Sequence, residues 1–134
     1  MAYVFTPDLE TKNALIDSEH KQLIKAINDL LEACSKGQGR AQVAQTAKFV
    51  YDYTSKHFAD EERLQLQYKY PDYPNHKRYH EAFKKSILDI MKKLDQQGAT
   101  VAMVSEINLT LAGWLTNHIK REDKKLAAFI RGEK

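Results

Sequence analysis

The chain has 134 residues, of which 43% are hydrophobic and 29% charged, and its formal net charge is +3. This balance is that of a globular protein long enough to bury one core, so we expect a single domain over residues 1–134. Lysines and arginines are scattered, and no apolar run approaches the roughly 18 residues of a membrane span, so we expect neither nucleic-acid partners nor membrane insertion.

The N-terminal segment predicts an extended arm of about fifteen residues laid across the rest of the chain. Its first residues, MAYVFTPDLE, lack a basic region followed by a long apolar run, so we expect no secretory signal and a cytoplasmic location. Cys34 is the single cysteine, which argues against an internal disulfide or a thiolate metal site. Because it falls in an apolar stretch, we expect a buried, unreactive thiol.

Four segments then carry apolar residues at alternating spacings of three and four, the pattern of a helix with one buried face. The first stripe, which we expect Asp17 or Ser18 to cap and SKGQGR to end, is Ile16, His20, Leu23, Ile27, Leu30 and Cys34. The second stripe, which the prolines of YPDYPN stop, is Val43, Ala47, Val50, Thr54, His57, Glu61, Leu64 and Tyr68.

The third and fourth segments follow the same pattern. The third stripe, ended by QQGAT, is His76, His80, Phe83, Ile87, Ile90 and Leu94. The fourth segment is expected to run from about residue 101 to 130, with Thr100 as its cap. It carries two adjacent stripes. The first is Val104, Ile107, Leu111, Leu115 and His118, and the second is Ile119, Asp123, Leu126 and Ile130. No stretch alternates as a strand would. We therefore predict an all-α protein, an up-down-up-down antiparallel four-helix bundle with an extended N-terminal arm.

All five histidines fall on these inner faces, accompanied by two acids. A spacing of four leaves side chains about 40° apart on a helix, so His57 can converge with Glu61 and His76 with His80. Asp123 lies five residues beyond His118, about 140° round an ideal helix. It can still reach inward from the neighbouring stripe, most readily if the helix is locally distorted.

Taken singly, each of these residues has a plainer explanation. A histidine on an apolar stripe is more often hydrogen-bonded in the core than a ligand, Glu61 fits a helix rim, and Asp123 sits in a charged run. Together, however, their burial would cost several kcal/mol each without a shared partner, and a metal offsets that cost. Seven donors exceed what one ion takes and suit two ions bridged by carboxylates. Nitrogen-rich ligation fits iron better than magnesium or calcium.

Four motifs resemble the hemerythrin family, in its single-domain bacterial form. They are LIDSEHKQL, HFADEE, YPDYPNHKRYH and WLTNHIKRED, in this order along nearly the whole chain. The resemblance implies a non-haem di-iron centre with an oxo or hydroxo bridge, at which O2 binds reversibly. It also implies the ligands: His76, His80 and His118 on one iron, His20 and His57 on the other, which keeps an open position, and Glu61 and Asp123 bridging both. Bacterial members often carry a tryptophan in the arm, where this chain has Phe5.

An O2 site of this kind needs apolar walls that exclude water. The candidates, for which plain core packing is an equal explanation, are Leu23, Phe58, Trp114, Leu115 and Ile119.

The first functional hypothesis is a non-enzymatic O2 carrier, store or delivery protein. The alternatives are oxygen or redox sensing, a di-iron redox enzyme that handles peroxide or nitric oxide, and a zinc or purely structural bundle. Besides O2, an electron donor or an oxygen-consuming enzyme is a candidate partner. Exposed apolar residues form no evident stripe, so we expect a monomer.

Overall fold

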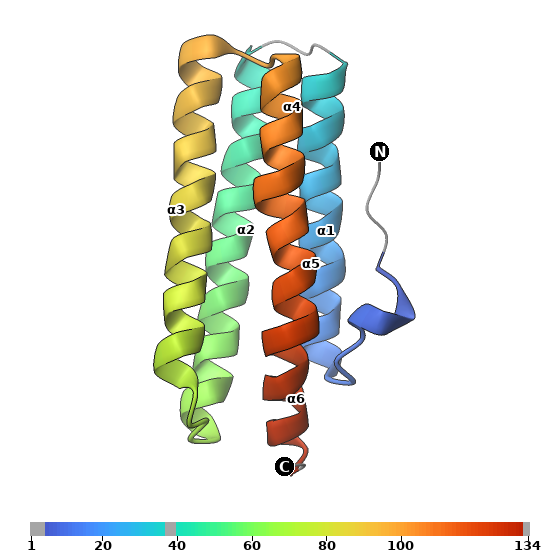
Figure 1. Cartoon of the computed structure of the whole chain (residues 1–134), viewed down its shortest axis with the longest axis vertical. Helices are drawn as coiled ribbons and strands as arrows, with labels where there is room; N and C mark the ends of the chain where they lie inside the picture. The colour runs from blue at the N-terminus through green and yellow to red at the C-terminus, as the bar shows by residue number, and fades with distance from the viewer. Residues whose placement is uncertain (1–4, 37–39, 133–134) are drawn as a thin grey trace.

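The computed structural model describes residues 5–36 and 40–132 (Figure 1). Three long helices stand side by side: α1 (Ala14–Ser35), α2 (Arg40–Gln67) and α3 (Tyr73–Gln97). A fourth helical rod closes the bundle, and its consecutive segments are α4 (Val101–Ile107), η2 (Asn108–Gly113), α5 (Trp114–His118), η3 (Ile119–Asp123) and α6 (Lys124–Ile130). The described residues contain no strand. The predicted all-α, up-down-up-down bundle is confirmed.

The apolar stripes meet in two separate clusters along the bundle axis. The larger one begins around Leu23 and extends to the end of the bundle where α4 starts, with Met103 3% exposed. It includes Cys34, whose thiol is buried as predicted. A smaller cluster at the opposite end is built from Ile16, Tyr70 and Leu126. Between them lies a layer of polar side chains, flanked by apolar packing at both ends.

The helix starts confirm one predicted cap and correct another. Thr100 caps α4, because its hydroxyl accepts a hydrogen bond from the Met103 backbone N–H at 3.1 Å. The prediction of Asp17 or Ser18 as the cap of α1 is wrong. The cap is Asn13, whose side chain accepts from the Ile16 backbone N–H at 3.1 Å.

Asp17 instead ties the arm to the first turn of α1. Its carboxylate accepts hydrogen bonds from the backbone N–H and the hydroxyl of Thr11, at 2.9 and 2.7 Å. Asp17 therefore lies inside the helix, where a carboxylate in the first turn also faces the positive end of the helix dipole.

The turn between α2 and α3 corrects one member of the second stripe. Tyr68 is 43% exposed, although the spacing placed it on the buried face. The helix has already ended at Gln67, and Lys69 turns the chain with φ of 55°. Pro74 does not lie in the turn itself but in the first turn of α3, where a missing N–H costs nothing. The predicted break at SKGQGR falls on residues 37–39, which lie outside the described residues.

The N-terminal arm runs beside the lower part of α1 and the fourth rod (Figure 1). It contains one short 3-10 turn, η1 (Pro7–Leu9), and buries Leu9 to 2% exposure. Asp8 anchors it to the fourth rod, because its carboxylate pairs with Lys120 at 3.0 Å and its carbonyl oxygen accepts from Lys124 at 2.8 Å. Phe5 stands where bacterial members of the family that the sequence resembles often carry a tryptophan, and its ring packs against the core.

The fourth rod is continuous over the predicted range but is not α-helical throughout. Two segments, η2 and η3, have the wider π-helical hydrogen bonding. Such segments are rare and occur mostly as single turns within α-helices, often at functional sites. Within the described part of the chain, no helix is long and apolar enough to cross a membrane.

Candidate metal centre

The polar layer contains all seven residues that the sequence singled out. His20 comes from α1, His57 and Glu61 from α2, His76 and His80 from α3, His118 from α5 and Asp123 from η3. His118 is 5% exposed and the other six are fully buried. Seven ionisable side chains from every part of the bundle therefore meet in its interior.

Their donor atoms form two groups that overlap. In each group, one ligand atom from every member lies within 4.8 Å of the others. The first group is Glu61, His76, His80, His118 and Asp123, and the second is His20, His57, Glu61 and Asp123. Three histidines thus belong to one group, two to the other, and both carboxylates to both.

Glu61 divides its two carboxylate oxygens between the groups. Oε1 lies 3.1 Å from Nε2 of His80 and 3.5 Å from Nε2 of His76. Oε2 lies 3.3 Å from Nε2 of His57 and 3.5 Å from Nε2 of His20. One oxygen therefore faces the three-histidine group and the other faces the two-histidine group.

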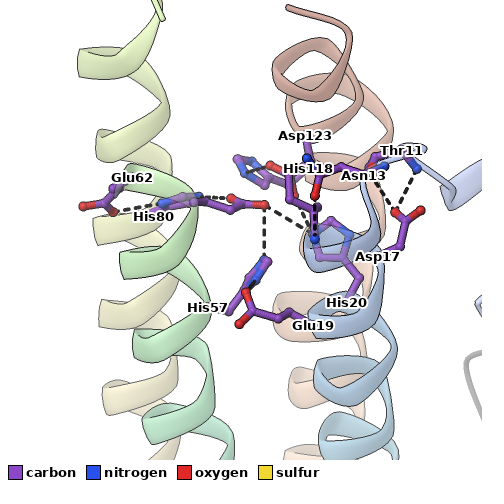
Figure 2. A network of polar contacts seen from close by, with 12 residues as sticks. Thr11, Asn13, Asp17, Glu19, His20, His57, Glu62, His80, His118 and Asp123 are labelled. Carbon is purple, nitrogen blue, oxygen red and sulfur yellow. Dashed lines mark hydrogen bonds and ion pairs between the residues drawn. The ribbon is translucent and has the colours of Figure 1, made fainter. Parts of the chain in front are cut away.

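Asp123 is divided in the same way. Oδ1 lies 2.9 Å from Nε2 of His76 and 3.2 Å from Nε2 of His118, whereas Oδ2 lies 2.9 Å from Nε2 of His20. Asp123, His118 and His20 are labelled in Figure 2. Two carboxylates that each present one oxygen to either group are the arrangement that bridges a pair of cations.

The π-helical segment η3 brings Asp123 onto the face of His118. In an α-helix a residue five positions on lies about 140° away. Here the chain makes a π-type bond, in which the Lys124 backbone N–H donates to the Ile119 carbonyl oxygen. The wider turn contains more residues than an α-helical turn, so it reduces the angle between residues five positions apart. The π-helical turn of η3 is therefore the local helix distortion that was expected to let Asp123 reach the interior.

The electrostatics of the layer couple the imidazoles to the carboxylates. Burial disfavours a charged His57, but the Glu61 charge, the hydrogen bond to Glu19 and the close contact with Glu61 outweigh the cost of burial and raise the pKa of His57 to about 10. Burial likewise opposes a charged His76, but its hydrogen bond to Asp123 and its close contact with Glu61 raise its pKa to about 10.

The carboxylates respond in the opposite direction. Burial raises the pKa of Glu61, yet the His57 charge and the close contacts with the nitrogens of neighbouring histidines hold it well below the usual value. Burial and the Glu61 charge raise the pKa of Asp123, yet His118 and His20 hold it well below the usual range. In the metal-free protein, imidazolium protons balance the two carboxylates, and a bound cation would replace those protons.

The residues fit a metal pair because several buried polar atoms of the layer have no hydrogen-bond partner among the described residues. Buried atoms that make no hydrogen bond of adequate geometry with the described residues include Nε2 of His20, His57 and His80, both Glu61 oxygens and Oδ2 of Asp123. Buried polar atoms without partners are rare and costly in native proteins. Imidazole nitrogens and carboxylate oxygens are also the donors that first-row transition metals take.

Two further carboxylates contact the outer nitrogens, Nδ1, of two of the histidines, and the sequence analysis did not single out either. Glu19 Oε1 lies 2.9 Å from Nδ1 of His57, and Glu62 Oε2 lies 3.0 Å from Nδ1 of His80 (Figure 2). A signal was available, because Glu19 lies three residues after Ile16 and four before Leu23, on the buried stripe of α1. Gln65, four residues beyond Glu61, is also fully buried and was not singled out.

Each of the five candidate pocket residues lies within four residues of a ligand histidine along its helix. Leu23, Phe58, Leu115 and Ile119 are buried, and Trp114 is half-buried. Phe58 stacks on the His80 ring with centroids 3.7 Å apart, and Trp114 stacks on the His118 ring at 4.5 Å. The two aromatic rings therefore cover the three-histidine group.

Comparison with known proteins agrees with this arrangement. The family model of the hemerythrin HHE cation binding domain matches residues 11–130. The chain belongs to the hemerythrin family. The resemblance carried by the four sequence motifs is confirmed.

Several hemerythrin relatives match over most of their length. The bacteriohemerythrin of Stenotrophomonas maltophilia (strain R551-3) is 36% identical over 128 residues, which cover 96% of this chain and 81% of the relative. The bacteriohemerythrin of Pseudomonas aeruginosa (strain LESB58) is 34% identical over 128 residues, with the same 96% and 81% coverage. The myohemerythrin of Sipunculus nudus is 32% identical over 123 residues, which cover 92% of this chain and 89% of the relative.

Proposed function

We propose that this hemerythrin-family chain binds O2 reversibly at two non-haem iron ions joined by an oxo or hydroxo group, as a non-enzymatic carrier, store or delivery protein. The observation that carries the proposal is the division of the Glu61 and Asp123 oxygens between a three-histidine and a two-histidine group. The family membership and the names of the relatives, bacteriohemerythrin and myohemerythrin, support it.

The proposed ligand roles follow the two groups. One iron would be held by the three histidines His76, His80 and His118, and the other by His20 and His57. Glu61 and Asp123 would bridge the two ions. The two-histidine position then receives one protein donor fewer, and this difference leaves room there for an exogenous ligand.

The chain's own residues would do three things. The imidazoles would offer neutral nitrogen donors once a cation has displaced their protons, and the carboxylates stay ionised, since their pKa values lie well below the usual range. Apolar side chains around the layer, among them Leu23 and Ile119, exclude water from the centre. When bound, the iron pair supplies the electrons that make O2 binding possible.

The test is metal content together with an optical cycle. Purified protein should contain two iron ions per chain. After reduction without oxygen, admitting O2 should produce a visible absorption band, and removing O2 should abolish it over repeated cycles.

Other outcomes would favour the other hypotheses. Irreversible oxidation on the first exposure to O2, with turnover of peroxide or nitric oxide, would support a redox enzyme. Stoichiometric zinc in a colourless protein would overturn the O2-binding proposal.

A further inference from the structure

One histidine of each group is held between two carboxylates. His57 lies between Glu61, which contacts its Nε2 at 3.3 Å, and Glu19, which contacts its Nδ1 at 2.9 Å. His80 lies between Oε1 of Glu61, 3.1 Å from its Nε2, and Glu62, 3.0 Å from its Nδ1 (Figure 2). An ionised carboxylate only accepts hydrogen bonds, so when the ring is neutral its proton lies on Nδ1. This tautomer leaves Nε2, the nitrogen that faces the layer, free to donate its lone pair.

The two outer carboxylates also connect neighbouring helices. Glu19 precedes His20 on α1 and reaches His57 on α2, and Glu62 follows Glu61 on α2 and reaches His80 on α3. Each contact therefore fixes a ring orientation from an adjacent helix. This is a positioning role.

The surroundings of the two outer carboxylates differ. Glu19 is 4% exposed, and its second oxygen receives a hydrogen bond from Nζ of Lys56 at 2.9 Å. Lys56 also bonds Asp60 at 3.0 Å, so one ammonium serves both acids. The Glu62 side chain is 20% exposed, and no lysine or arginine of the described residues forms an ion pair with it. The carboxylate behind His57 is thus neutralised by a lysine, whereas the one behind His80 is not.

We propose, on the basis of the di-iron function above, that Lys56, Glu19 and Glu62 add to the inequality of the two metal positions, beyond the inequality that their different numbers of histidines already create. A carboxylate hydrogen-bonded to a ligand imidazole makes the imidazole a stronger donor. Because the Lys56 ammonium neutralises the Glu19 carboxylate, Glu19 accepts less strongly from Nδ1 of His57, and Nε2 of His57 becomes a weaker electron-pair donor to a metal at the two-histidine position. The ion held by His20 and His57 is therefore the more easily released. Glu62, which is not paired with a lysine of the described residues, strengthens the donation of His80, so the ion in the three-histidine group is held more firmly.

The test follows the release of iron from protein loaded with two Fe²⁺ per chain under nitrogen, using excess of a coloured Fe²⁺ chelator. The wild-type chain should release its two ions in a fast and a slow phase. The different numbers of histidines alone would also give two phases, so the variants carry the test. Glu19→Gln keeps an acceptor for Nδ1 but removes the charge, and should accelerate the fast phase about tenfold. Lys56→Met should slow that same phase about tenfold, because Glu19 is left uncompensated. Glu62→Gln should accelerate only the slow phase.

The opposite signs separate electronic from merely structural effects. If Lys56 and Glu19 served only to hold the bundle together, both variants would speed release and lower the melting temperature alike. Lys48→Met is the matched control, since Lys48 pairs with Asp52 at 2.8 Å on the same helix and with the same spacing but touches no histidine partner. It should leave both phases unchanged.

The outcomes distinguish this proposal from the function on which it rests. A wild-type chain that fails to take up two iron ions contradicts the proposed function. A wild-type chain that binds two ions but releases them in one phase overturns the inequality of the positions. Equal shifts of both phases in all three variants overturn it as well.

Discussion

Replacement of Asp123 by asparagine probes the centre at the residue that joins its two groups. Asp123→Asn preserves shape but removes the charge and replaces one oxygen by an amide nitrogen. The native carboxylate lies 2.9 Å from His76, 3.2 Å from His118 and 2.9 Å from His20. The asparagine oxygen can serve one group only, so the other group loses its contact.

The loss of stability can be estimated for the metal-free protein. Each charge-assisted hydrogen bond contributes about 1.5–3 kcal/mol, and removing one partner of a buried ion pair typically costs about 3–5 kcal/mol. The histidines can release protons to limit the loss, so we expect about 3 kcal/mol. For a chain of this length, about 4 °C per kcal/mol converts this to a fall in melting temperature of roughly 12 °C.

Calorimetry of the metal-free protein and iron analysis of the loaded protein measure the two effects. Iron should fall from two ions per chain to one or none. Asp52→Asn is the control: Asp52 pairs with Lys48 at the surface, and the loss of this pair should cost less than about 0.5 kcal/mol. An Asp123→Asn variant that keeps two iron ions and the native melting temperature would refute the bridging role.

Three further predictions follow from burial. Burial raises the pKa of the Cys34 thiol, so a thiol reagent at pH 8 should modify it slowly in the folded protein and completely in denaturant; rapid modification of native protein would contradict this. Burial and nearby acids raise the pKa of Tyr70 to about 12, so an ultraviolet titration should show this phenol ionising after the exposed tyrosines. The stability linked to the neutral phenol is present below pH 10 and is lost as the pH rises from there towards 12. Phe58→Ala removes a buried ring stacked on His80, and urea titrations should show a free energy of unfolding lowered by about 3–5 kcal/mol. Leu109→Ala is the control: Leu109 is 74% exposed, and its replacement should change the free energy of unfolding by less than about 0.5 kcal/mol.

The helical spacings were sufficient to predict the bundle and the inward direction of the histidines. The reason is physical: within a helix, a stripe with a period of three and four is the face that packs against the other helices, and a polar residue in the middle of it is buried as well. His57, His76 and His80 could be placed in the interior on this basis alone. The seven donors converge because each of the four helical rods presents at least one of them at a similar height along the bundle.

Features that depend on local backbone geometry or on contacts between helices could not be predicted in the same way. Asn13 rather than Asp17 caps α1, because Asp17 is drawn to Thr11 of the arm, a contact that no helical period indicates. The π-type turn of η3 has no composition signal of its own, and only the five-residue spacing from His118 to Asp123 pointed to it.

The outer carboxylates illustrate the same limit. Glu19 lies on the buried stripe of α1, so its burial could have been predicted. Its partners could not, because the contacts with His57 and Lys56 depend on how α1 packs against α2.

The most direct measurement is anomalous diffraction at the iron absorption edge from crystals of the iron-loaded protein. Two peaks should appear in the polar layer, one bonded to His76, His80 and His118 and the other to His20 and His57, with Glu61 and Asp123 bonded to both. A single peak, a peak elsewhere in the molecule, or scattering at the zinc edge instead would contradict the di-iron assignment.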